Sequence, residues 1–153
     1  MEEEFYCEWL GYNIEVSYDE DISREYIEKN LKYLNELDKG FLKKICICIR
    51  AYYESYKELY PDLSDDLDIL EELEKKPEAI LDHIDIGVCT FNDYEEKDSA
   101  IPVLNISGDC GWAGDKGITI VAKDNKILYV GPWQDFDIWK SKLEHFKFNY
   151  ALQ

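Results

Sequence analysis

A glycine-rich stretch at residues 107–117, "SGDCGWAGDKG", holds a cysteine whose neighbours raise the question of chemistry. A thiol becomes a nucleophile or a metal ligand when a nearby base or a helix N-terminus favours the thiolate. His145 and Asn149 follow Cys110 in the order of a Cys, His, Asn triad, which makes a cysteine hydrolase using Cys110 and His145 one hypothesis. In cysteine hydrolases the nucleophile lies at the start of a helix, which favours the thiolate. Cys110 is instead followed by glycines and a strand-like run. The pattern favours a small buried thiol that is dispensable for function.

The other potential ligands do not indicate a metal or cofactor site. The two histidines, His83 and His145, are far apart in sequence, and no His or Cys cluster has the spacing of structural zinc sites. The glycine-rich stretch offers only Asp109 and Asp115 to calcium, and the chain lacks a phosphate-binding glycine motif. We therefore expect no metal and no cofactor.

Cysteine usage and the first residues suggest where the protein resides. The five cysteines are odd in number and lack a C-x-x-C spacing, which is typical of reduced thiols in a cytosol. The beginning "MEEEFYCEWLGYN" lacks the basic and apolar regions of a secretory signal, and no apolar run is long enough to span a membrane. We expect a cytoplasmic protein that does not bind membranes.

The net charge is the strongest compositional signal. The 153 residues carry 34 acids and 17 bases, a formal charge of −17, and the acidic excess is concentrated in the first half. Such a surface repels phosphate backbones and attracts cationic partners, so nucleic acid is disfavoured as a ligand. A basic protein is the partner that this charge predicts.

The segment "DLSDDLDILEELEKKPE", residues 62–78, carries the densest group of acids. Its leucines form a narrow apolar stripe, which predicts an amphipathic helix over residues 63–75 with an acidic outer face. Carboxylates that speed encounter, combined with tyrosines that anchor a partner, would form a docking surface. The predicted partner-binding residues are Asp65, Asp66, Asp68, Glu71, Glu72, Glu74, Tyr53 and Tyr60. Two alternatives stay open: the acids form a solvated helix face, and tyrosines at helical spacing belong to the core.

Apolar periodicity predicts the remaining elements of the first half. Alternation from Phe5 to Tyr18 indicates an N-terminal hairpin that turns near Gly11. Helices are predicted over residues 22–38 and 41–60. The second contains "ICICI", which resembles a strand, but the helical stripe from Phe41 to Leu59 is longer than that alternation. On a helix Cys46 and Cys48 point to nearly opposite sides, so they cannot act as a pair.

From residue 84 onward, short β-rich runs replace the helical pattern. They predict antiparallel strands over residues 84–91, 101–107, 117–123 and 126–131, followed by a terminal helical segment. The length suits one core, and no linker or repeat interrupts the chain. Residues 1–153 are therefore predicted to form a single α+β domain.

Two resemblances bear on function. The stretch "DCGW" resembles signatures of papain-like and cell-wall cysteine peptidases, which implies the hydrolase hypothesis already given. Residues 101–136 resemble an uncharacterised bacterial domain family in which a Trp loop leads into a hairpin ending Val-Gly; Trp112, Gly117 and Gly131 match, whereas the acid and the His of that loop are replaced. This resemblance implies a bacterial protein without assigned chemistry, of a kind found near toxin systems.

Taken with the charge, these patterns predict a non-enzymatic cytosolic protein that binds a basic protein partner, and most concretely a bacterial toxin-immunity protein. Small acidic proteins that neutralise basic nuclease toxins bind them in this way. The alternatives are the cysteine hydrolase and a housekeeping domain without a separable activity.

Overall fold

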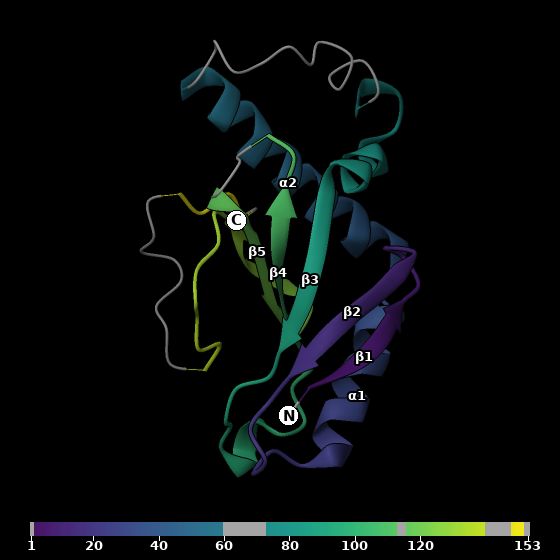
Figure 1. Ribbon diagram of the computed structural model, residues 1–153, viewed down its shortest axis with the longest axis vertical. Coiled ribbons are helices and arrows are strands. Elements are labelled where there is room, and N and C mark those ends of the chain that lie inside the picture. Colours follow the sequence, from purple (N-terminus) through teal and green to yellow (C-terminus); the bar gives the residue numbers. More distant parts are fainter. Residues whose placement is uncertain (1, 60–72, 113–115, 140–147, 152–153) are drawn as a thin grey trace.

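The computed structural model describes residues 2–59, 73–112, 116–139 and 148–151 (Figure 1). They form one six-stranded sheet with helices against it, which confirms the predicted α+β class. The strands are β1 (Glu2–Cys7), β2 (Tyr12–Ser17), β3 (Ile84–Thr90), β4 (Val103–Cys110), β5 (Ile118–Lys123) and β6 (Lys126–Gly131). The helices are α1 (Arg24–Asn35) and α2 (Lys39–Leu59), with short 3-10 turns η2 (Pro77–His83) and η3 (Glu96–Asp98).

The spatial order of the strands is their order in the chain, β1 to β6. Neighbouring strands are antiparallel except β2 and β3, which are parallel and pair Val16 with Cys89. Parallel neighbours need a long crossover connection, and α1 and α2 belong to it. The predicted hairpin and the later strands are therefore parts of a single mixed sheet.

Helix α1 begins at a conventional cap. The Ser23 hydroxyl accepts a hydrogen bond from the Tyr26 N–H at 3.4 Å, which satisfies one of the unpaired donors of the first turn. Ile27, Leu31 and Leu34 share the buried face. The helix predicted over residues 22–38 is thus confirmed in a slightly shorter form.

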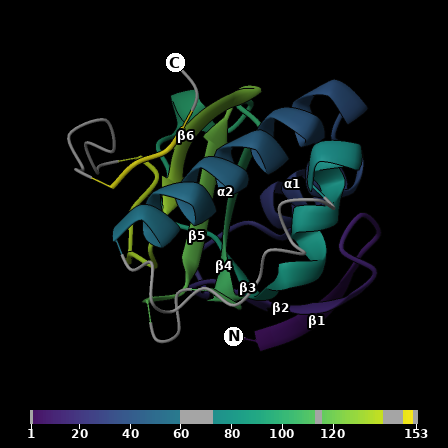
Figure 2. The ribbon, with the colours of Figure 1, turned by 90° about the horizontal axis from the view of Figure 1, so that it is seen from above.

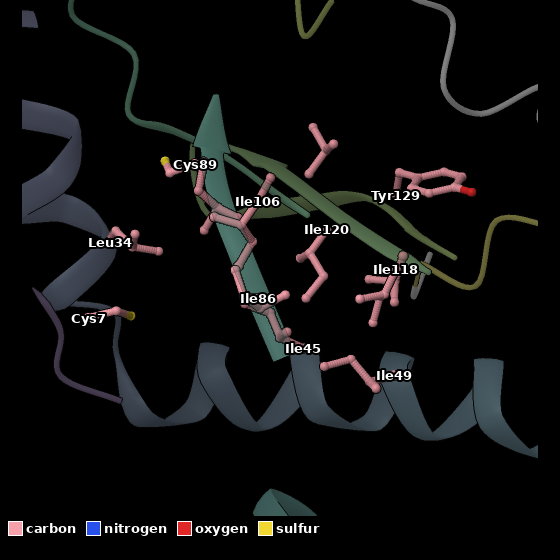
Figure 3. Close-up of a cluster of buried hydrophobic side chains, with 14 of the residues drawn as sticks. Cys7, Leu34, Ile45, Ile49, Ile86, Cys89, Ile106, Ile118, Ile120 and Tyr129 are labelled. Atoms are coloured by element: carbon pink, nitrogen blue, oxygen red, sulfur yellow. The ribbon is translucent and has the colours of Figure 1, made fainter. Parts of the chain in front are cut away.

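Helix α2 confirms the helical interpretation of "ICICI" (Figures 2 and 3). Ile45 and Ile49 point toward the sheet, and Figure 3 shows them facing Ile86, Ile118 and Ile120. The sheet does not account for all of the burial, because η2 packs against the same helix and both thiols of "ICICI" are fully buried. This second layer explains why Cys46 and Cys48 are both buried, whereas Ile47 between them is exposed.

Strand β4 is longer than predicted and runs through Cys110, where the sequence suggested that the strand ends at residue 107. Gly108 makes this extension feasible, because a Cβ at this position would collide with the Asp85 carbonyl oxygen of β3. Cys110 is therefore the last residue of a strand rather than part of a loop.

The two faces of the sheet are covered differently. On the face opposite the helices, the segment after β6 lies over β4 and β5: the Asn105 amide donates to the Phe136 carbonyl, and the Gln134 N–H donates to Thr119 Oγ1 at 3.1 Å. Phe136 and Ile138 are buried there. The strands β1 to β3 carry exposed side chains on that face, including Glu4 and Glu15.

Two predicted helices fall largely outside the described residues. Of the helix predicted over residues 63–75, the structure describes residues 73–75, which are helical. Of the terminal helical segment, it describes residues up to 139, where Ile138 and Trp139 form a turn, and residues 148–151, which are not helical. Among the helices that the structure describes, none is long and apolar enough to cross a membrane.

Candidate functional site

Two of the sequence-predicted partner-binding residues lie within the described structure. Glu74 is exposed on the helical turn at residues 73–75. Tyr53 is 1% exposed, so its prediction as a surface anchor is wrong: the ring packs edge to face against Trp112, with the centroids 5.3 Å apart. The remaining six, Asp65, Asp66, Asp68, Glu71, Glu72 and Tyr60, lie outside the described residues.

Cys110 lies in a closed setting at the end of β4. Its thiol, 5% exposed, donates to the Gly117 carbonyl with an Sγ to O distance of 3.4 Å. The Tyr52 hydroxyl donates to the same carbonyl at 2.8 Å. Gly117 has a φ of +66°, a conformation that glycine adopts without strain and that lets this carbonyl serve two donors.

Aromatic rings enclose that setting. Trp112 contacts Tyr52 edge to face with centroids 5.6 Å apart, and Tyr150 stacks on the same tyrosine at 5.4 Å. The Tyr150 hydroxyl is 2.9 Å from the Ser55 hydroxyl on α2, which ties the end of the described chain to the helix. Burial raises the pKa of Tyr52 well above its usual range. These neutral, aromatic surroundings are typical of a cysteine with a structural role, as we infer for Cys110. His145, the second residue of the hydrolase hypothesis, lies outside the described residues.

The other thiols are also protected. All five cysteines are buried and free of disulfides. Burial raises the pKa of Cys7 to about 11 and the pKa values of Cys46 and Cys89 to about 12, so these thiols remain protonated at neutral pH. In the described part of the chain no group of three or more His, Cys, Asp or Glu side chains could hold a metal ion.

The uncovered part of the sheet carries a different kind of candidate. We call it the acidic face and define it by the exposed side chains of Glu4, Glu15, Asp85 and Asp109. These residues come from four neighbouring strands, β1 to β4. Tyr6, which is 53% exposed, is next to Glu4 on the same face of β1.

The carboxylates of the acidic face stand in opposed pairs. Glu4 is directly opposite Glu15, and Asp85 is directly opposite Asp109. Like charges in such positions destabilise an antiparallel pair of strands. None of the four forms an ion pair with another described residue, whereas Glu3 on the opposite side of β1 is bound by Arg24 at 2.7 Å.

A hollow opens beside the first of these pairs. It has a volume of about 390 Å³, and its lining includes Glu4, Asn13, Glu15 and Gly87. A Cβ at Gly87 would meet nothing within 4 Å, so the glycine leaves the floor of the hollow open. The hollow can admit the end of a long side chain between the two glutamates.

Comparison with known proteins places the chain in a family. Residues 1–138 match the family model described as Domain of unknown function (DUF6985). The chain belongs to this family. No curated protein matches it, and neither does any solved structure. The match covers nearly the whole chain, whereas the resemblance found in the sequence covered residues 101–136, and both point to a family without assigned chemistry.

In this DUF6985 chain, part of the acidic face could have been found from the sequence. The alternation that predicts the hairpin assigns Phe5, Ile14 and Val16 to the core, so its polar half, with Glu4 and Glu15, must be exposed. No local signal places Asp85 opposite Asp109, because that pairing depends on the register of β3 and on the extension of β4.

Proposed function

We propose that this DUF6985 chain binds a basic protein partner through its acidic face and does not catalyse a reaction. The most concrete form of the proposal is a toxin-immunity protein of the bacterial cytoplasm. The observation that supports it most is that carboxylates lie opposite each other on the acidic face, Glu4 opposite Glu15 and Asp85 opposite Asp109. No cation among the described residues forms an ion pair with them.

The argument is one of charge compensation. Opposed carboxylates cost stability in the free protein, and a lysine or arginine from a partner would relieve that repulsion on binding. The hollow over Gly87 offers such a side chain a route to both Glu4 and Glu15. Tyr6 adds an exposed ring of the kind that anchors arginine-rich surfaces.

The acidic segment at residues 62–78 supplies a second part of this proposal. Its carboxylates add to the same negative field, which extends beyond contact distance and is screened by salt over about 8 Å at physiological ionic strength. In our proposal the segment raises the encounter rate, and the acidic face holds the partner. Of the segment's carboxylates, the structure describes Glu74, which is exposed, and Glu78, which is partly exposed.

The hydrolase alternative has less support. A catalytic thiol needs exposure and a group that stabilises the thiolate. Cys110 is 5% exposed and donates to a carbonyl within an aromatic enclosure. A housekeeping domain would not by itself account for opposed carboxylates on an open face.

The test compares association rates of variants with a basic partner captured from the native cell. The first variant, Glu4→Gln, Glu15→Gln, Asp85→Asn and Asp109→Asn, neutralises the acidic face. A matched control carries Glu20→Gln, Asp21→Asn, Asp93→Asn and Glu96→Gln, which remove the same charge from exposed sites elsewhere. We expect association of the first variant at low salt to slow about tenfold, and that of the control by less than about twofold.

A third variant neutralises Asp65, Asp66, Asp68, Glu71, Glu72 and Glu74 with Asn and Gln. We expect a slower association whose deficit disappears at high salt, because this segment acts at long range. Equal rates for wild type and the first variant at low salt would contradict binding through the acidic face. Equal association rates for wild type and the third variant at low salt would show that the acidic segment does not raise the encounter rate.

A further inference from the structure

The two edges of the sheet are closed to different degrees. At the β6 edge, residues near the C-terminus cover the backbone: the Tyr150 N–H donates to the Val130 carbonyl at 2.7 Å, and the Asn149 amide bonds to Val130 and Leu128. At the β1 edge, none of the strands that the structure describes continues the sheet. An edge strand of this kind presents unpaired backbone groups.

Asn35, the last residue of α1, shows which backbone groups of β1 point outward. Its Nδ2 donates to the Tyr6 carbonyl at 3.0 Å, and its Oδ1 accepts from the Glu8 N–H at 2.9 Å. The amide thus occupies the place of a neighbouring strand's peptide group. Because outward and inward residues alternate along an antiparallel strand, Glu4 also directs its N–H and C=O outward. Among the described residues, Asn35 hydrogen-bonds to this edge at Tyr6 and Glu8, and no described residue bonds to the outward backbone groups of Glu4.

A groove runs beside that open edge, between β1 and α1. Its volume is about 430 Å³, and Phe5 and Leu31 contribute apolar surface to it. Glu8, Glu28 and Glu36 line it as well, together with the cations Lys32 and Arg24. Arg24 is already held by Glu3 and Glu28 at 2.7 and 3.2 Å. The groove therefore combines apolar surface with an excess of one carboxylate, and it lies beside the outward-facing backbone groups of β1.

These features define the chemistry of an occupant. An extended segment beside β1 would place alternate side chains toward Phe5 and Leu31, where apolar groups fit. The intervening side chains would reach the acidic face next to Glu4, where basic groups fit. A second copy of this chain would instead bring its own β1 edge, with Glu4 and Glu8, beside the same acids of the first copy, which like-charge repulsion opposes.

We propose that the β1 edge accepts an extended segment of a basic protein as an added strand, with alternating apolar and basic side chains, in the groove between β1 and α1. This inference rests on the proposed function and specifies how the partner is held. Backbone hydrogen bonds to Glu4 supply part of the affinity, and the groove and the acidic face select the sequence.

The test uses the peptide Lys-Val-Lys-Leu-Lys-Val-Lys, blocked at both ends, and the unmodified protein. Two isomers carry two N-methyl groups each, on apolar residues in one and on lysines in the other. They match in composition and charge. Because alternate residues of an added strand direct their N–H groups toward β1, methylation removes these donors in one isomer and spares them in the other. We expect that isomer to bind about tenfold or more weakly than the other, and hydrogen exchange at Glu4 and Tyr6 to slow about tenfold with the unmethylated peptide.

The outcomes separate this inference from the function on which it rests. Equal binding of both isomers, without slower exchange at Glu4 and Tyr6, would overturn strand addition. If that binding still weakened with salt and in the variant with a neutralised acidic face, the proposed function would stand. An absence of salt-dependent binding by every peptide would overturn both. Protection of the same amides by dimerisation of the protein alone would assign the edge to a second copy and overturn the inference.

Discussion

At the scale of single residues, asparagine amides join elements that are distant in sequence. Asn30, 1% exposed on α1, donates to the Tyr26 carbonyl at 3.0 Å and accepts from the Val103 N–H at 2.9 Å. Asn35 and Asn149 do the same at the two sheet edges. An amide side chain can replace a peptide group because it offers a donor and an acceptor together.

Asn30→Ala should lower the free energy of unfolding by about 1 to 3 kcal/mol, because it leaves the buried Val103 N–H without its acceptor. Urea denaturation measures the change. Asn13→Ala on the exposed face of β2 is the control and should change stability by less than about 0.5 kcal/mol. Equal effects at both positions would show that the Asn30 bonds do not hold α1 to β4.

Cys110 should react slowly with iodoacetamide at neutral pH, no faster than the other four cysteines, because its thiol is buried against the Gly117 carbonyl. Mass spectrometry after timed labelling gives the rate at each site. Unfolding in urea should make all five thiols react quickly. Preferential labelling of Cys110 in the folded protein would instead support the hydrolase hypothesis.

At the scale of elements, the sequence predicts structure well where one local period dominates. The stripe from Phe41 to Leu59 outweighs "ICICI", and α2 is a helix as expected. Local period does not predict the parallel pairing of β2 with β3, which depends on the crossover through α1 and α2. The docking hypothesis placed Tyr53 at the surface, whereas the ring is buried against Trp112, which comes from a part of the chain distant in sequence.

The opposed glutamates make an element-scale prediction. Glu15→Gln should raise the free energy of unfolding by about 0.2 to 1 kcal/mol, because it removes the repulsion with Glu4 across the hairpin. Glu3→Gln is a matched control on the same hairpin, and it should give no gain because Glu3 is paired with Arg24. A stability loss in Glu15→Gln, measured in urea at low salt, would mean that Glu15 is compensated in the free protein.

At the scale of the whole molecule, buried ionisable groups make stability depend on alkaline pH. Burial raises the pKa of Tyr26 to about 12, as it does for Cys46 and Cys89, so these groups are neutral in the folded state. The unfolded chain ionises first as pH rises. Stability is therefore complete below the ordinary pKa of cysteine and falls as pH rises toward the folded values near 12.

Between pH 8 and pH 10, the free energy of unfolding should fall by about 1 to 2 kcal/mol for each such thiol. Urea denaturation at several pH values gives the slope. Cys89 is 2% exposed, so its thiol ionises only when the chain unfolds. Because alanine has no ionisable group, Cys89→Ala should make the slope shallower by about the contribution of one thiol. An unchanged slope in that variant would show that Cys89 ionises equally in both states.

The cover that Asn149 and Tyr150 give to β6 has a consequence for assembly. If the residues from Asn149 onward were removed, the molecule would have an open edge on each side of the sheet. The β6 edge of one molecule could then pair with the β1 edge of the next, and because this head-to-tail contact uses two different edges, each added molecule presents a new open edge. Asn149 and Tyr150 would thus prevent linear polymers, and their removal should appear as fibres whose growth depends on concentration.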